Sequence, residues 1–156
     1  MANILNLFKF IESKRKQYRV PLQIKLINNL PLTKEDLTVR GYLDLSNTQI
    51  KSLPNNLTIH GTLNLSNTQI KSLPDNLKVY GDLYLSNTPI QSLPNNLTIN
   101  GYLDLRNTPI QSLPNNLTVK GILDLERTPI SKKYTKEQIR KMIEDKGGSV
   151  KDLYLN

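Results

Sequence analysis

The chain has 156 residues, the size of one domain, and 21 Lys and Arg against 13 Asp and Glu give a formal net charge of +8. It has no cysteine, which excludes disulfides and every cysteine-based enzyme mechanism. It also lacks an apolar run of about 18 residues and the charge order of a signal peptide, so we expect no membrane span and a cytoplasmic protein.

Most of the positive charge lies at the two ends of the sequence. Residues 1–36 carry seven bases and three acids (+4), and residues 131–156 carry seven and four (+3). The middle, residues 37–130, carries seven and six (+1). We interpret the basic residues of the ends as solvated helix faces.

The first 36 residues are expected to form an N-terminal helical cap. Apolar residues follow a roughly helical spacing in the first twenty positions: Ile4, Leu5, Phe8, Ile11 and Tyr18. Because the end of a repeat stack exposes apolar surface, we expect this helix to cover the first coil.

Residues 37–130 repeat one 20-residue unit, with units starting at residues 37, 57, 77, 97 and 117. A fixed period of this length is typical of a solenoid. Counted from the first Leu of each unit, places 3, 5, 7 and 9 hold Val or Ile, Gly, Leu and Leu, and they alternate with variable places. This period of two predicts strands with one buried face: Val39–Leu45, Ile59–Leu65, Val79–Leu85, Ile99–Leu105 and Val119–Leu125.

Equivalent strands should lie side by side in one register, which makes the sheet parallel, with neighbours about 4.8 Å apart. The return segments contain Leu-Pro and Asn-Asn, so we expect extended or polyproline-like segments with tight turns. A glycine at place 5 points inward, which indicates that another backbone comes close there. The alternative fold is a β-helix with two or more strands per coil, because TxIxSL is itself compatible with a strand.

Residues 131–156 are expected to close the other end. The stretch from Thr135 to Gln138 has the pattern of a capping box, and Gly147-Gly148 would stop the helix, which predicts a helix over about residues 135–146. Residues 150–155 repeat the strand motif one residue short, so we expect a last strand there.

The pattern LxLxxTxIxSLPxxL of Leu43–Leu57 resembles the leucine-rich repeat, most closely the short LP-type repeats of secreted bacterial effectors. The resemblance covers residues 37–130, about 60% of the chain. Thr occupies the place where the family has a ladder of Asn, and its hydroxyl can also bond to backbone carbonyls; LxVxGxL in place of LxxL implies a longer, flatter strand. The repeats are also similar to those of small bacteriophage proteins, which implies an accessory, host-directed role such as interference with a host defence protein.

The resemblance implies a binding module and does not identify what is bound. The cysteine ubiquitin ligase domain of some effectors has no counterpart here, and no phosphate-loop or dinucleotide fingerprint is present. We therefore expect a protein that is not an enzyme and takes no cofactor.

The outward places 4, 6, 8 and 10 vary most and predict a contact face. They hold three bases and five acids (net −2) and four of the seven tyrosines, and Tyr is enriched in binding hot spots. The alternative is that aromatic residues simply suit strands. The candidate partner-binding residues are Arg40, Tyr42, His60, Tyr80, Asp82, Tyr84, Asn100, Tyr102, Asp104, Arg106 and Asp124.

Two candidate chemical sites are weak in the sequence. His60 is the only histidine and has no companion ligands, so we interpret it as a contact residue and not a metal site. Asp104 and Asp124 should be neighbours in adjacent coils, as in a glycosidase pair, but Arg106 and Lys120 lie close to them. That combination indicates a mixed-charge surface ladder.

The leading hypothesis is therefore a non-enzymatic module that binds a protein with a basic or mixed-charge surface through the exposed sheet face. A second hypothesis is nucleic-acid binding through the caps, with Lys14, Arg15, Lys16, Arg19, Lys132, Lys133, Lys136, Arg140 and Lys141. A third is a structural protein that self-assembles end to end through imperfectly covered edges.

Overall fold

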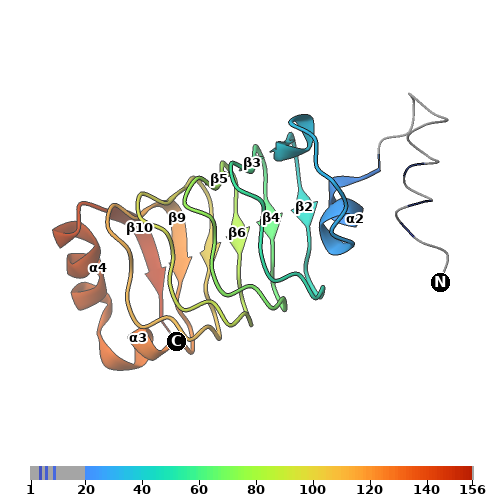
Figure 1. Cartoon of the computed structure of the whole chain (residues 1–156). Coiled ribbons are helices and arrows are strands. Elements are labelled where there is room, and N and C mark those ends of the chain that lie inside the picture. Colours follow the sequence, from blue (N-terminus) through green and yellow to red (C-terminus); the bar gives the residue numbers. More distant parts are fainter. Residues whose placement is uncertain (1–3, 5, 7–8, 10–19, 156) are drawn as a thin grey trace.

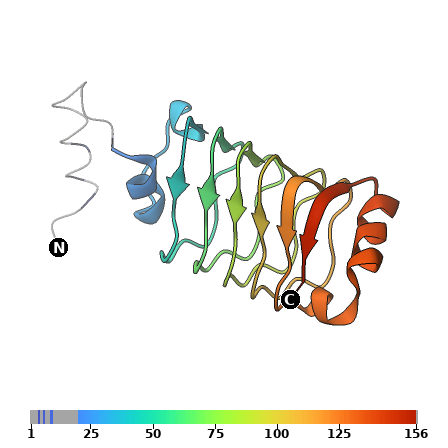
Figure 2. The ribbon, with the colours of Figure 1, turned by 180° about the vertical axis from the view of Figure 1, so that it is seen from behind.

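The structure, a computed structural model that describes residues 4, 6, 9 and 20–155, is a β-solenoid. Successive 20-residue coils stack in a nearly straight row, with helices at the two ends (Figures 1 and 2). All strand pairs are parallel, and equivalent residues pair with an offset of one coil, as Leu43 with Leu63 and Leu63 with Leu83. The predicted solenoid with a parallel sheet is confirmed.

Each of the first four coils contains two short strands. The first row is β1 (Thr38–Val39), β3 (Thr58–Ile59), β5 (Lys78–Val79) and β7 (Thr98–Ile99). The second row is β2 (Leu43–Asp44), β4 (Leu63–Asn64), β6 (Leu83–Tyr84) and β8 (Leu103–Asp104). Both rows pair with β9 (Thr118–Asp124), which pairs in turn with β10 (Ser149–Tyr154).

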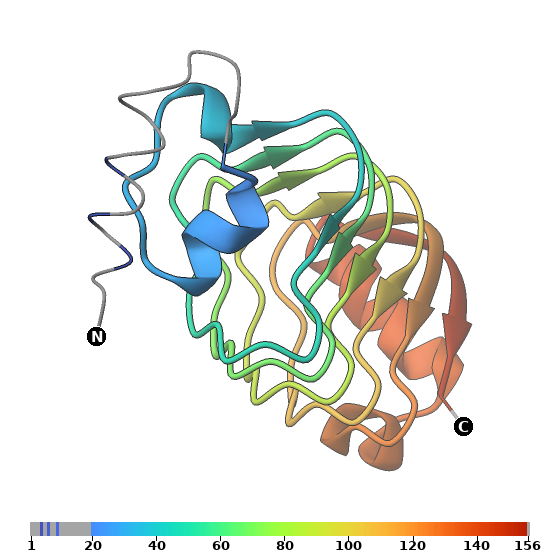
Figure 3. The same ribbon diagram turned by 90° about the vertical axis from the view of Figure 1, so that its right-hand side faces the viewer.

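The two rows meet at a corner, which Figure 3 shows along the axis of the solenoid. The chain bends at residues 40–41, 60–61, 80–81 and 100–101, so the predicted seven-residue strand is continuous only in β9. The additional strand lies before the glycine and not in the TxIxSL segment, where the alternative β-helix would place it.

The glycines at the corner let the coils approach, as predicted. The backbone N–H of Gly81 donates to the carbonyl of Gly61 (3.0 Å), and that of Gly101 donates to the carbonyl of Gly81 (3.2 Å). A Cβ atom on Gly81 would lie 2.7 Å from the carbonyl carbon and oxygen of Gly61. A side chain at position 81 would therefore meet the backbone of the preceding coil.

The inward Leu, Ile and Val residues form one core along the stack. The return segments contain no helix, which agrees with the expected extended path. At each corner that follows the second strand row, the Thr hydroxyl donates to the carbonyl three residues earlier, as from Thr68 to Leu65 (2.7 Å). The predicted bonding of Thr to backbone is thus confirmed, and it stays within one coil. Asn residues take the left-handed backbone of the turns, for example Asn67 with φ 59°.

At the N-terminal end, α2 (Leu22–Ile27) and η1 (Glu35–Leu37) precede the first coil. The ammonium of Lys25 lies 2.8 Å from Asp36 Oδ2, and both side chains are buried. Most of the predicted first-twenty helix lies outside the described residues. Of its apolar positions, only Ile4 is described, and it is helical and exposed.

At the C-terminal end, α3 (Pro129–Lys133) and α4 (Lys136–Asp145) precede β10. The capping box is formed: Gln138 N–H donates to Thr135 Oγ1, and Thr135 N–H donates to Gln138 Oε1. Ile139 and Ile143 of α4 are buried against the core. The missing residue of the last strand motif is absorbed by a shift in register between Val150 and Asp152.

Candidate functional site

The corner between the two strand rows divides the outward side chains of each coil into two facets. The first row of strands presents places 2 and 4, and the second row presents places 6, 8 and 10. Two separate hollows reflect this division: one is lined only by residues of the second row, such as Tyr42 and Tyr84, and the other by residues at the first row, such as Lys78 and Tyr80. The outward side chains that the sequence predicts on a single face therefore lie on two faces.

The predicted contact residues are distributed over both. Arg40, His60, Tyr80 and Asn100 lie on the first. The remaining predicted residues lie on the second: Tyr42, Asp82, Tyr84, Tyr102, Asp104, Arg106 and Asp124. The structure brings each of these groups together and separates one group from the other.

The two facets carry opposite charge. We call the outward residues of the second row and of its continuation in β10 the acidic facet. It holds one base, Arg106, and six acids, which gives a net charge of −5. The acids are Asp44, Asp82, Asp104, Asp124, Glu126 and Asp152. We call the residues at places 2 and 4 of each coil, together with Ser149 and Lys151 of β10, the basic facet. It holds no acid and four bases, which gives a net charge of +4. The bases are Arg40, Lys78, Lys120 and Lys151. The net charge of −2 predicted for one face conceals this separation.

On the acidic facet, several side chains are joined by hydrogen bonds and ion pairs in a cluster around Arg106. Its guanidinium binds Asp104 with two bonds, Nε to Oδ1 at 2.9 Å and Nη2 to Oδ2 at 2.8 Å, and Nε also lies 3.5 Å from Asp124 Oδ2. The hydroxyl of Tyr102 donates to Asp124 (2.5 Å). Hydrogen bonding to Asp104 raises the pKa of Arg106 above its ordinary value. Tyr102 and Arg106 thus hold both carboxylates.

The two carboxylates of this cluster are buried and not open for contact. Asp104 is 1% exposed and Asp124 is 7% exposed. Each also accepts a hydrogen bond from the backbone N–H two residues later, as Asp44 and Asn64 do in the first two coils. In four of the five coils, the residue at place 8 therefore closes a turn at the end of the strand. Asp104 and Asp124 support the surface, and Tyr102 and Arg106 form it.

Tyr84 occupies the same place in the third coil and has no such turn-closing bond. Its ring centroid lies 5.6 Å from that of Tyr102, and its hydroxyl approaches Asp82 (3.5 Å). Burial, followed by the charge of Asp82, raises the pKa of Tyr84. Tyr84 is thus the clearest departure from the structural pattern of the repeat on this facet.

A shallow hollow of about 580 Å³ lies over the second strand row. Tyr42, Tyr84 and Arg106 line it together with Asp82 and short polar side chains. Tyr42 at one end is 57% exposed, and its hydroxyl accepts from Asn64 Nδ2 at 3.3 Å. The hollow therefore combines aromatic surface, hydroxyl groups and negative charge.

The basic facet has its own aromatic pair. The rings of His60 and Tyr80 stack with centroids 5.2 Å apart and an angle of 6° between their planes. A second hollow of about 390 Å³ is lined by Tyr80, Lys78, Lys120 and neighbouring polar residues. Lys78 was not among the predicted contact residues because the predicted strand begins at Val79, one residue after the start of β5. Lys151, Asp152 and Tyr154 were not predicted because the contact face was not extended to the last strand.

The phenol of Tyr102 is expected to ionise only well above pH 10. Burial raises its pKa from the ordinary value of 10.0, and the bond to Asp124 raises it further. Because the folded protein retains the proton longer than the unfolded chain, this group makes stability fall as the pH rises above about 10. The absorbance titration of the wild type minus that of Tyr102→Phe measures this ionisation, and a midpoint near 10 would contradict the Tyr102–Asp124 bond.

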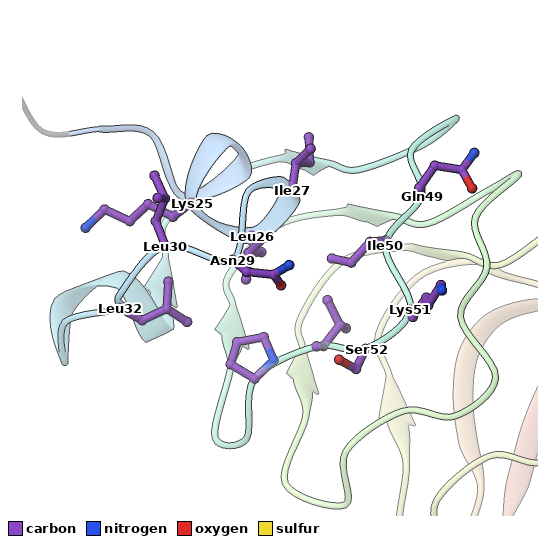
Figure 4. Close-up of a pocket in the computed structure, with 12 residues that line it drawn as sticks. Lys25, Leu26, Ile27, Asn29, Leu30, Leu32, Gln49, Ile50, Lys51 and Ser52 are labelled. Carbon is purple, nitrogen blue, oxygen red and sulfur yellow. The ribbon is translucent and has the colours of Figure 1, made fainter. Parts of the chain in front are cut away.

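A third hollow, of about 640 Å³, lies at the other end, between α2 and the first coil (Figure 4). Leu26, Leu30, Ile50 and Leu53 line it, so its apolar part continues the core of the stack. Lys25 at its edge is bound to Asp36. We interpret this hollow as the end of the core.

Within residues 4, 6, 9 and 20–155, no three His, Asp or Glu residues gather in a way that could hold a metal ion. No helix of this part of the chain is long and apolar enough to cross a membrane. In comparisons with protein-family models, curated proteins and solved structures, nothing matches this chain.

Proposed function

We propose that the chain is a non-enzymatic protein-binding module of the leucine-rich-repeat type, and that it binds through the acidic facet. The observation that carries this proposal is the gathering of Tyr42, Tyr84, Tyr102 and Tyr154 with a net charge of −5 on one row of strands. Rigid aromatic rings give contact area at low entropic cost, and the charge selects a partner.

The partner that fits best is a protein with a protruding Lys or Arg side chain in a basic surface. The hollow beside Tyr84 offers an aromatic ring and the carboxylate of Asp82 to such a cation. Cations near aromatic rings gain about 0.5–2 kcal/mol, with the larger value when water is excluded. The surrounding facet would supply the rim of an interface of about 800 Å² per partner.

The bonding of the carboxylates favours binding over catalysis. Asp104 accepts two bonds from the Arg106 side chain and one from its backbone N–H. Asp124 accepts from Tyr102 and from the backbone of Glu126. A general acid or nucleophile must reach a substrate, whereas these groups are occupied within the facet.

The test is a crosslinking pull-down with quantitative mass spectrometry that compares Tyr84→Ala with Tyr80→Ala. The two tyrosines lie in one coil on opposite sides of its corner, so the substitutions match chemically. We expect at least one captured protein to be lost about 10-fold or more with Tyr84→Ala and retained with Tyr80→Ala, since a hot-spot residue contributes about 2 kcal/mol.

A purified partner should then bind more weakly as salt rises, because the attraction between charged surfaces is screened. If the wild type and Tyr84→Ala capture every partner equally, the acidic facet is not the contact surface. If a partner is lost only in Tyr80→Ala, the contact lies on the basic facet.

A further inference from the structure

We propose that the basic facet is a second, independent binding surface, and that it takes the phosphate backbone and one base of a single-stranded nucleic acid. The first observation is charge. Arg40, Lys78, Lys120 and Lys151 are all exposed, the facet contains no acid, and no ion pair joins these four cations to a carboxylate in the described part of the chain. The net charge of the chain, +8, adds to the attraction of a polyanion.

The second observation is the arrangement of the hollow on this facet. His60 covers one face of Tyr80, and His60 does not line the hollow. The hollow extends toward the following coils, where Asn100 and Lys120 lie, so the other face of Tyr80 borders it. Tyr80 shares this hollow with two cations, Lys78 and Lys120. Proteins combine an aromatic face with nearby cations in this way to stack a base and hold the adjacent phosphates.

Asn100 and Thr98 complete the lining of the hollow. Their amide and hydroxyl groups can donate to phosphate or to a base edge without requiring a particular base. The facet is also extended, because Arg40 lies in the first coil and Lys151 continues the column after Lys120 in the last strand. A nucleic-acid strand laid along the solenoid axis would therefore meet cations in the first, third and fifth coils and in β10.

The basic residues of the C-terminal cap are less suited to this role because several are used for structure. Arg140 Nη1 donates to the carbonyl of Val150 (2.8 Å), and the ammonium of Lys136 lies 5.6 Å from the ring centre of Tyr154. Lys133 lies 5.1 Å from the ring centre of Tyr134. The geometry therefore favours the basic facet over the cap.

The experiment is fluorescence anisotropy with a labelled oligo-dT of about 20 nucleotides, with a duplex of the same length as a second probe. With four phosphate contacts, log K should fall with log salt with a slope of about −2.8, which corresponds to about 50-fold between about 50 and about 200 mM salt. The double variant Lys78→Gln and Lys120→Gln should reduce the slope to about −1.4.

The control for total charge is the double variant Lys51→Gln and Lys71→Gln. These two lysines occupy the same exposed position of the repeat in the return segments of the first two coils, away from the basic facet. The control should leave the slope unchanged. Equal weakening in both double variants would show that only net charge acts and would overturn the proposal, as would absence of binding at about 50 mM salt.

Stacking is tested by Tyr80→Ala, with Tyr42→Ala on the acidic facet as its control. Loss of one stacked base should weaken oligo-dT binding between about 5-fold and about 100-fold and leave duplex binding unchanged. Three results would overturn the proposal: tighter binding of the duplex, competition by a poly-glutamate peptide as strong as that by oligo-dT, or loss of binding only in Lys132→Gln with Lys133→Gln. The readouts are separate from the pull-down with Tyr84→Ala, so either function can fail alone.

Discussion

Replacement of Gly81 by alanine is expected to lower the free energy of unfolding by about 3 kcal/mol. The added Cβ would lie 2.7 Å from the carbonyl carbon and oxygen of Gly61 and 3.1 Å from the backbone nitrogen of Thr62. These atoms are backbone, so they cannot rotate away as a side chain would. Relief requires the two coils to separate, which lengthens the bond from Gly81 N–H to Gly61 and weakens the pairing on both sides of the corner.

Gly41→Ala is a matched control for this effect. It changes the same place of the repeat in the first coil, where nothing lies within 4 Å of the added Cβ. Neither glycine has a positive φ, so alanine is conformationally allowed at both. We expect Gly41→Ala to raise the free energy of unfolding by up to about 1 kcal/mol, because alanine restricts the unfolded chain. Urea unfolding followed by circular dichroism compares the variants, and equal stability of the two would show that the coils do not meet at the glycines.

The contrast between these glycines also explains why the fold could be predicted. A solenoid repeats its constraints, so a residue type required by contact between coils recurs at one place, as Gly does at place 5 and Thr at place 12. The period gave the register of the parallel sheet directly, and alternation identified the inward residues, such as Leu63 and Leu65. Both depend on local spacing, which is visible in one sequence.

The corner could not be predicted in the same way. Side chains at place 3 before the bend and at places 7 and 9 after it point inward, with glycine at place 5 between them, so a period of two continues through the bend. Arg40 and Tyr42 are consequently two residues apart in the sequence and lie on different facets. The opposite charge of the facets follows from this change of direction and not from composition.

The burial of Asp104 and Asp124 likewise depends on contacts that spacing does not reveal. Arg106 and Tyr102 reach over these carboxylates from neighbouring places and adjacent coils. One signal was available: Asp or Asn recurs at place 8 in four of five coils, whereas a contact position would be expected to vary more. That near-constancy indicates the turn-closing role, and it makes Tyr84, the exception, the more informative contact residue.

Asp36→Asn is expected to lower the free energy of unfolding by about 3 kcal/mol or more, because it removes the charged carboxylate that binds the buried ammonium of Lys25. Lys25 is 2% exposed, and Asp36 Oδ2 accepts from its ammonium at 2.8 Å. The N–H and hydroxyl of Thr33 also donate to Asp36 Oδ2, so the carboxylate organises the whole connection between α2 and the first coil. Neither the spacing nor the composition of residues 20–36 indicated this pair.

Asp75→Asn is the chemically matched control. Asp75 is exposed and stands where Asn occurs in equivalent coils, so this change should stay within about 0.5 kcal/mol. Addition of Lys25→Met to Asp36→Asn should recover part of the lost stability, because it removes a buried charge that no longer binds the carboxylate of Asp36. If the double variant is no more stable than Asp36→Asn, the cost does not come from that charge.

Acid unfolding gives an independent measure of the same pair. Burial alone would raise the pKa of Asp36, but the hydrogen bonds from Lys25 and Thr33 outweigh burial and lower the pKa below its ordinary value of 3.8. A lowered folded pKa contributes stability above the unfolded value, and this stability is lost as the pH falls through the folded pKa. Wild-type stability should therefore fall more steeply below about pH 4 than that of Asp36→Asn, whose residue 36 does not titrate. Parallel curves for the two proteins would mean that the carboxylate of Asp36 is not held by these bonds in solution, and the end of the stack would then need another anchor for α2.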